Sequence, residues 1–113
     1  MKRLLLLFLL CPTTLLMAQH LDPIQEAMAN YDYEAALSLI AAKKPTTPLL
    51  LQKGKALRGL GLNTEALSTY QEIITNDTTN SRAFIEAAEC CRTLAKSNHS
   101  LPHYVSCIFP NSQ

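Results

Sequence analysis

The feature that most constrains the fold of this chain is an internal repeat. When the sequence is aligned with itself at an offset of 34 residues, residues of similar size and polarity coincide: Leu50 with Phe84, Gly54 with Ala88, Leu57 with Cys91, Gly61 with Ala95, Ala66 with Ser100, Leu67 with Leu101 and Tyr70 with Tyr104. An offset of 30 aligns residues 31–40 with residues 61–70. A period of this length is typical of stacked supersecondary units.

Each unit is predicted to form two α-helices, because apolar and small residues recur three and four positions apart. The residues with this spacing in the middle unit are Leu50, Lys53, Gly54 and Leu57 in its first helix, and Ala66, Leu67, Tyr70, Ile73 and Ile74 in its second. Asn63 or Thr64 offers a side-chain oxygen that could cap the second helix. No stretch shows the alternation of a half-buried β-strand. We therefore expect an all-α fold.

The outer units are less regular. Asp22 followed by Pro23 predicts a helix over about 22–30, and a second helix is expected over about 33–44. Ser81 is the predicted cap of the third unit. Pro102 lies within the expected second helix of that unit and is tolerable only if the helix begins late. The last unit is therefore distorted, or another copy covers its open face by self-association, or the chain is a truncated fragment of a longer array.

The period and the order of large and small residues resemble the tetratricopeptide repeat (TPR) family. The resemblance covers three units, at about residues 20–46, 47–80 and 81–110. Residues that match the family's packing positions are Leu50, Gly54, Leu57, Gly61, Ala66 and Tyr70, with Phe84, Ala88 and Tyr104 in the third unit. The first unit departs from the pattern, since Ile24 stands where a small residue is expected. The resemblance implies a helix–turn–helix solenoid over residues 19–113.

TPR arrays generally act as protein–protein interaction scaffolds that bind peptides or partner proteins on their concave face. By resemblance, the first-helix residues on that face here are Leu51, Lys55, Arg58, Arg82, Ile85, Glu89 and Arg92. This largely cationic set with apolar patches suits an extended or acidic peptide. Family members that clamp a peptide carboxylate use asparagines where Lys55 and Glu89 stand, so that activity is not expected. The alternative is that these positions are solvated helix surface.

The N-terminus has the pattern of a secretory signal peptide. Lys2 and Arg3 precede the apolar residues 4–11, and a second apolar patch ends at the small residue Ala18. The unbroken apolar run is far shorter than the ~20 residues that span a bilayer. We predict that residues 1–18 are cleaved and that the protein is exported, periplasmic or secreted, without an integral membrane span. Cleavage leaves eight Lys and Arg against nine Asp and Glu, a balance that does not favour nucleic acid.

Residues 89–107 contain a group of cysteines and histidines: Cys90, Cys91, His99, His103 and Cys107. A small thiol- or metal-binding protein that uses these residues is the alternative function. The repeat places Cys91 and Cys107 late in two antiparallel helices, about 15 Å apart at 1.5 Å per residue. A disulfide needs a Cα separation below about 7 Å, so we expect no disulfide between them. The histidines are expected on an outward face, and we predict neither a metal site nor a cofactor.

The sequence offers little for catalysis. It contains no Gly-rich phosphate loop, no Gly-x-Ser-x-Gly elbow and no His-Glu-x-x-His pair. Its carboxylates are spread along the predicted helix surfaces. We therefore expect a non-enzymatic protein.

Overall fold

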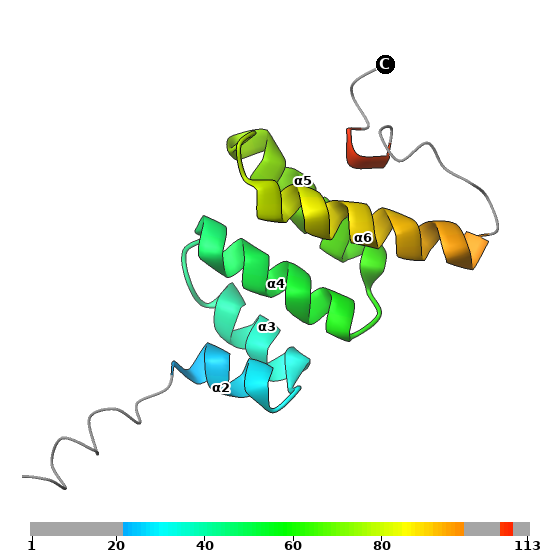
Figure 1. Ribbon diagram of the computed structural model, residues 1–113. Helices are drawn as coiled ribbons and strands as arrows, with labels where there is room; N and C mark the ends of the chain where they lie inside the picture. Colours follow the sequence, from blue (N-terminus) through cyan, green and yellow to red (C-terminus); the bar gives the residue numbers. More distant parts are fainter. Residues whose placement is uncertain (1–21, 99–106, 110–113) are drawn as a thin grey trace, which may run out of the picture.

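The computed structural model describes residues 22–98 and 107–109, which form five α-helices and no β-strand (Figure 1). The helices are α2 (Pro23–Ala29), α3 (Tyr33–Ala41), α4 (Thr47–Gly59), α5 (Asn63–Asn76) and α6 (Ser81–Asn98). The prediction of an all-α fold is confirmed for this part of the chain. The predicted signal peptide, residues 1–18, lies outside the described residues, as do Pro102 and Tyr104.

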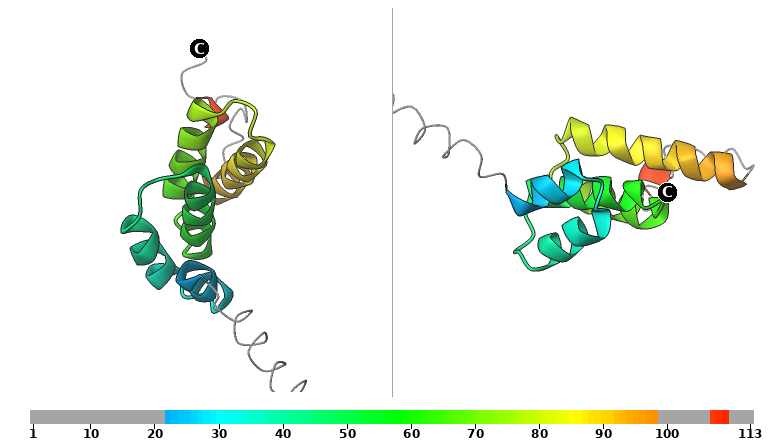
Figure 2. Two further views of the ribbon diagram at one scale, coloured as in Figure 1. Left: turned by 90° about the vertical axis from the view of Figure 1, so that its left-hand side faces the viewer. Right: turned by 90° about the horizontal axis from the view of Figure 1, so that it is seen from below.

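The helices pack in chain order. The main contacts join α2 with α3, α3 with α4, α4 with α5, and α5 with α6. Figure 2 shows this succession from α2 at one end to α5 and α6 at the other. Each helix is therefore stabilised mainly by its neighbours along the chain, so the described part has mostly local topology.

Side chains of polar residues define four of the five helix starts. Asp22 accepts a hydrogen bond from the backbone N–H of Ile24 at 3.2 Å, and Asp32 accepts one from Ala35 at 3.1 Å. At the start of α4, the hydroxyl of Thr46 accepts a hydrogen bond from the backbone N–H of Leu49. These contacts satisfy backbone donors that have no partner within the first turn.

Two of the predicted caps are wrong. The residue that precedes α5 is Leu62, which makes no side-chain capping bond, and Asn63 instead donates to the carbonyl oxygen of Gly61. At the start of α6 the amide oxygen of Asn80, not Ser81, accepts from the backbone of Ala83 at 3.1 Å. In both cases the preceding turn sets the first helical residue, and a polar residue nearby is not enough to place it.

The turns after α2 and α4 have the same backbone geometry. After α4, the N–H groups of Gly61 and Leu62 donate to carbonyls of the last helical turn, and Gly61 has φ +78°. After α2, Tyr31 and Asp32 repeat these bonds, and Tyr31 has φ +59°. This is the usual left-handed helix ending, for which glycine is preferred. The alignment of 31–40 with 61–70 therefore reflects two equivalent turns.

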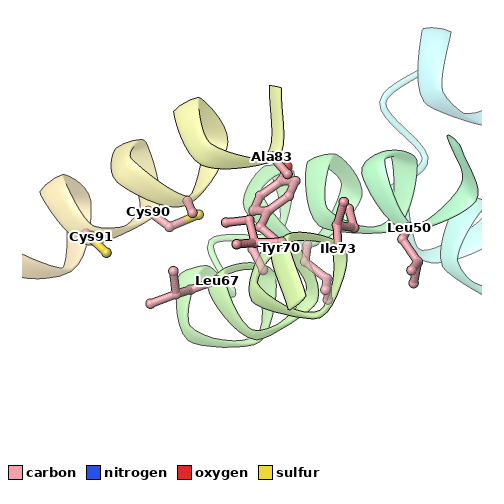
Figure 3. Close-up of a cluster of buried hydrophobic side chains, with 11 residues drawn as sticks. Leu50, Leu67, Tyr70, Ile73, Ala83, Cys90 and Cys91 are labelled. Carbon is pink, nitrogen blue, oxygen red and sulfur yellow. The ribbon is translucent and has the colours of Figure 1, made fainter. Parts of the chain in front are cut away.

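The core lies between α4, α5 and α6 (Figure 3). Tyr70 and Ile73 of α5 are each only 1% exposed, and they pack with apolar residues of both neighbouring helices. A Cβ atom at Gly54 would overlap the ring of Tyr70. The absence of a side chain at Gly54 therefore lets α4 approach α5 closely at this point.

The expected second helix of the third unit lies mostly outside the described residues. Among the residues after α6, the structure describes Cys107–Phe109, of which only Cys107 and Ile108 are helical. Both contact the core, and the Phe109 ring lies 5.6 Å from that of Phe84. We call Cys107–Phe109 the C-terminal strap. It packs against the core formed with α5 and α6, at the end of the chain where the sequence left open a distorted unit, a face covered by another copy or a truncated array.

Candidate binding groove

Two neighbouring cavities lie along α2, α4 and α6. One cavity, of about 290 Å³, is lined by residues of α4, α5 and α6: Pro48, Leu51, Gln52, Lys55, Tyr70, Arg82 and Glu86. A second, of about 310 Å³, lies between α2 and α4 and shares two residues with the first; it is lined by Gln25, Met28, Ala29, Gln52 and Lys55. Because Gln52 and Lys55 line both cavities, we treat the two as one site and call it the α2/α4/α6 groove.

The floor of this groove contains buried polar atoms without a hydrogen-bond partner among the described residues. These are the Oε1 atom of Gln52 and the hydroxyl oxygen of Tyr70. The guanidinium of Arg58 lies near the Tyr70 hydroxyl and interacts with it, and it also donates a hydrogen bond to Glu86. A buried polar atom without a partner costs free energy. Both atoms are almost fully covered by protein, so a ligand would reach them only if the side chains above them moved.

The environment of Tyr70 keeps its hydroxyl protonated. Burial raises the pKa of Tyr70 to about 12, and the charges of Glu86 and Cys90 act in the same direction. The cation of Arg58 opposes this increase only in part. At neutral pH, Tyr70 is therefore a hydrogen-bond donor at the floor of the groove.

One carboxylate links α4 to α6 at the edge of the groove. Glu86 accepts a hydrogen bond from Arg58 of α4, and its other oxygen lies 4.0 Å from Nε of Arg82. The Glu86 and Arg58 side chains are partly buried, at 24% and 32% exposed, so the pair is screened less than a surface ion pair. The network holds two first helices together and neutralises part of the positive charge that the sequence predicted.

The predicted concave-face residues are only partly brought together. Leu51, Lys55 and Arg82 line the same cavity, and Arg58 reaches it through Glu86. Ile85, 63% exposed, does not line either cavity of the groove. The remaining two, Glu89 and Arg92, bond to each other at 2.6 Å, and this bond lowers the pKa of the Glu89 carboxyl.

Sequence reasoning missed Gln52 and Glu86, which lie at the centre of the groove. They are equivalent residues, since they align at the 34-residue offset. Gln52 is also three residues before Lys55, so helical spacing already placed it on the same face. Glu86 is likewise four residues after Arg82, so helical spacing indicated that both Gln52 and Glu86 lie on the predicted face.

The predicted packing positions are mostly buried. The residues below 10% exposure are Leu50, Leu57, Ala66 and Tyr70, while Gly54 is buried beside Tyr70, and Phe84 and Ala88 are half-buried. Gly61 forms the turn described above. These positions form the core, so they lie apart from most of the α4 and α6 residues that line the groove.

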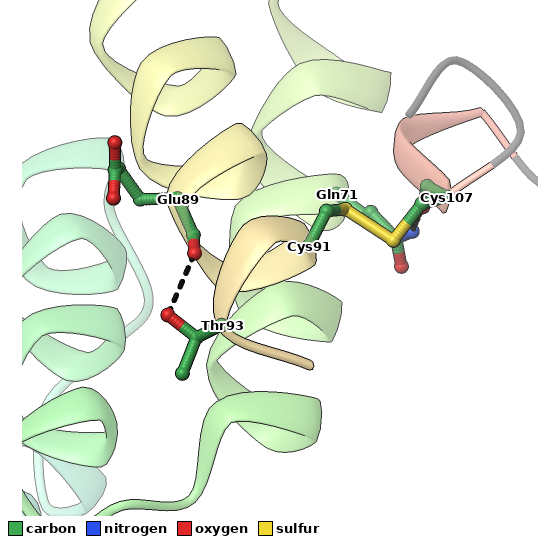
Figure 4. The surroundings of a disulfide bond; sticks show 5 residues. All are labelled: Gln71, Glu89, Cys91, Thr93 and Cys107. Carbon is green, nitrogen blue, oxygen red and sulfur yellow. Dashed lines mark hydrogen bonds between the residues drawn. A yellow bond between two sulfur atoms is a disulfide. The ribbon is translucent and has the colours of Figure 1, made fainter. Parts of the chain in front are cut away.

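The prediction for Cys91 and Cys107 is wrong: they form a disulfide, with a Cα–Cα distance of 6.2 Å (Figure 4). The prediction assumed two antiparallel helices of similar length, whereas α6 continues past Cys91 to Asn98. Cys107 therefore returns to the middle of α6. The amide of Gln71 in α5 also donates to the carbonyl of Cys107 at 2.8 Å.

The rest of the cysteine and histidine group does not form a site in the described residues. Cys90 is a buried free thiol, and burial raises its pKa, which disfavours the reactive thiolate. No three His, Cys, Asp or Glu residues lie close enough to hold a metal within the part of the chain that is described. His99 and His103 fall outside that part.

Comparisons with known proteins give no match. No protein-family model, curated protein or solved structure matches this chain. Among the described helices, none is long and apolar enough to cross a membrane.

Proposed function

We propose that this protein is a non-enzymatic interaction scaffold that binds an extended, acidic peptide segment of a partner protein in the α2/α4/α6 groove. The observation that carries this proposal is the pair of cavities that meet at Gln52 and Lys55 along α4. The amide side chain of Gln52, which lines both cavities, can accept and donate hydrogen bonds. An extended peptide backbone offers both an N–H group and a carbonyl oxygen.

The charge of the groove supports an acidic partner. Lys55 lines both cavities and is exposed, and it makes no ion pair with the described residues. Arg58 and Arg82, by contrast, both interact with Glu86. Lys55 is therefore the cation best placed to meet an acidic side chain, which would add specificity and speed association.

We also propose that the helices form a short TPR-like array of about three units. Two observations support it: the equivalent turns at Tyr31 and Gly61, and the close approach of α4 and α5 at Gly54. Export, as the N-terminal sequence predicts, would place the protein in an oxidising compartment, where the Cys91–Cys107 disulfide would persist. The alternative of a thiol or metal site loses two of its five ligands to that disulfide.

The groove is tested with a peptide selected for binding. Extended peptides that bind the purified protein would be selected from a displayed random library, and their dissociation constants measured by fluorescence anisotropy. Lys55→Glu should weaken an acidic peptide at least tenfold, or about 1.4 kcal/mol, and reduce the salt dependence of binding. Gln52→Leu should weaken it as well, because the acceptor is lost.

Lys53→Glu is the matched control. It makes the same charge change two residues away, on a face of α4 that does not line the groove. Selected peptides that bind Lys55→Glu and Gln52→Leu as well as the original protein would contradict the proposal. Peptides that lose affinity in Lys53→Glu alone would place their site on the opposite face.

A further inference from the structure

A separate apolar cavity lies between α3 and α4. It has a volume of about 440 Å³, and aliphatic side chains of both helices make up most of its lining. Leu37 and Ile40 contribute from α3, while Leu49 and Leu57 contribute from α4. The volume is in the lower part of the range of small-molecule sites, roughly 300–1,000 Å³.

The cavity follows from the unequal lengths of the two helices. α3 has 9 residues and α4 has 13, and residues 42–46 cross between them without helical structure. The α4 residues Leu49, Lys53 and Leu57 are four positions apart, so they form one stripe along the helix. The shorter α3 covers this stripe incompletely and leaves the cavity beside it.

Lysines provide all the charge in the cavity lining. Lys43 and Lys53 line it, and no carboxylate does. Lys43 lies 3.9 Å from Asp22, but both side chains are about half exposed, so this pair holds Lys43 only weakly. Lys53 has no ion pair with the described residues. The aliphatic stems of these lysines can line the apolar space while their ammonium groups stay at its rim.

The polar groups of the lining side chains decide what kind of ligand fits. The two ammonium groups donate hydrogen bonds and cannot accept them. A peptide backbone that entered would leave its N–H groups without side-chain acceptors, at a cost in free energy. A carboxylate only accepts hydrogen bonds, so it complements both lysines, and an alkyl chain complements the aliphatic walls.

From this complementarity we infer that the α3/α4 cavity binds an amphiphilic anion, a medium-chain alkyl carboxylate, with its chain among the leucines and its head group at Lys43 and Lys53. The site is separate from the α2/α4/α6 groove, and the inference does not rest on the proposed peptide binding. It gives the chain a small-molecule site in addition to a protein-binding surface.

The probe is sodium decanoate, titrated into the purified protein below its micelle concentration and followed by isothermal calorimetry. We expect saturable binding at one site and a rise in the thermal unfolding midpoint. Lys53→Gln should weaken binding roughly tenfold, since it removes a charge-assisted hydrogen bond. Lys53→Arg should retain binding, and this variant guards against loss of folding in Lys53→Gln. Lys55→Gln, on the opposite face, should leave the affinity unchanged.

Three results would overturn the inference. The first is the absence of saturable binding by the folded protein. The second is equal affinity for decanoate and decanol, which would remove any role for the lysines. The third is competition between decanoate and an acidic, leucine-containing peptide that depends on Lys53, which would make the cavity a peptide site instead.

Discussion

Removal of the Cys91–Cys107 disulfide should destabilise the protein by an amount that the length of the closed loop sets. The two cysteines are 16 positions apart. In the chain-entropy model, a cross-link over a loop of this size restricts the unfolded chain and stabilises the native state by about 3 kcal/mol. We therefore expect Cys91→Ala/Cys107→Ala to lower the free energy of unfolding by about that amount.

The native state can reduce this loss by releasing the C-terminal strap. Without the disulfide, the strap is held by the Gln71–Cys107 hydrogen bond and by packing of Ile108 and Phe109. One hydrogen bond contributes about 1 kcal/mol, and Phe109 remains partly exposed. If the strap detaches, less surface is exposed on unfolding, so the urea m-value should fall. The figure of about 3 kcal/mol is then an upper value.

The assay is urea unfolding followed by far-UV circular dichroism, with and without a dithiol reductant. The original protein should lose stability on reduction, and the double variant should not respond. Cys90→Ala is the matched control, because it removes a buried cysteine next to Cys91 but keeps the disulfide. An original protein that reductant leaves unchanged would refute the argument. Loss of the response in Cys90→Ala would show that Cys90 takes part in the pairing.

Two further predictions concern the contact between α4 and α5. Gly54→Ala gains about 1 kcal/mol of helix propensity. It also forces a methyl group into the ring of buried Tyr70, at a cost of about 1–3 kcal/mol, so a net loss of up to about 2 kcal/mol is expected in urea unfolding. Gly59→Ala is its control: the new methyl meets the ring of half-buried Tyr33, which can move, so little stability should be lost. The second prediction is a loss of stability at alkaline pH. The pKa of Tyr70 is about 12 in the folded state against 10.0 for an ordinary tyrosine, so the unfolded chain ionises first as the pH rises. Stability should fall by up to about 2–3 kcal/mol between those pH values, and Tyr70→Phe should remove this part of the dependence. An unchanged alkaline profile in Tyr70→Phe would contradict the buried environment of the hydroxyl.

The fold could be predicted where local signals agreed. The buried stripes of α4 and α5 follow helical spacing directly, and the 30-residue alignment superimposes the two turns that share one backbone geometry. Tyr31 adopts a left-handed conformation because it replaces the glycine of the later turn, Gly61. Such features depend on a few neighbouring residues, so they are visible in the sequence.

The groove could be predicted only to within about one residue. Periodicity shows which residues share a helix face, but the direction of that face depends on how the helix packs against its neighbours. The predicted set included Ile85, which does not line the groove, and omitted Gln52 and Glu86, which do. A change of one residue rotates the face by about 100°, which is enough to exchange an apolar surface for a polar one.

The disulfide could not be predicted because it depends on where α6 ends. Nothing in residues 92–98 marks an earlier helix end, since this stretch contains neither glycine nor proline. The repeat pattern nevertheless suggested a short first helix. With α6 extended to Asn98, Cys107 meets Cys91 in the middle of the helix. The position of a long-range contact is thus set by tertiary structure. A repeat alignment assumes equal units and does not show where one unit departs from the others.

Helix α4 connects the two proposed sites. Lys53 and Lys55 are two residues apart, so their side chains point about 200° apart around the helix axis. Lys53 lines the α3/α4 cavity, and Lys55 lines the α2/α4/α6 groove. A ligand in the α3/α4 cavity would contact one face of α4, and the opposite face of α4 lines the α2/α4/α6 groove. The two charge variants therefore separate the sites, and a change in peptide affinity on adding decanoate would measure coupling through α4 itself.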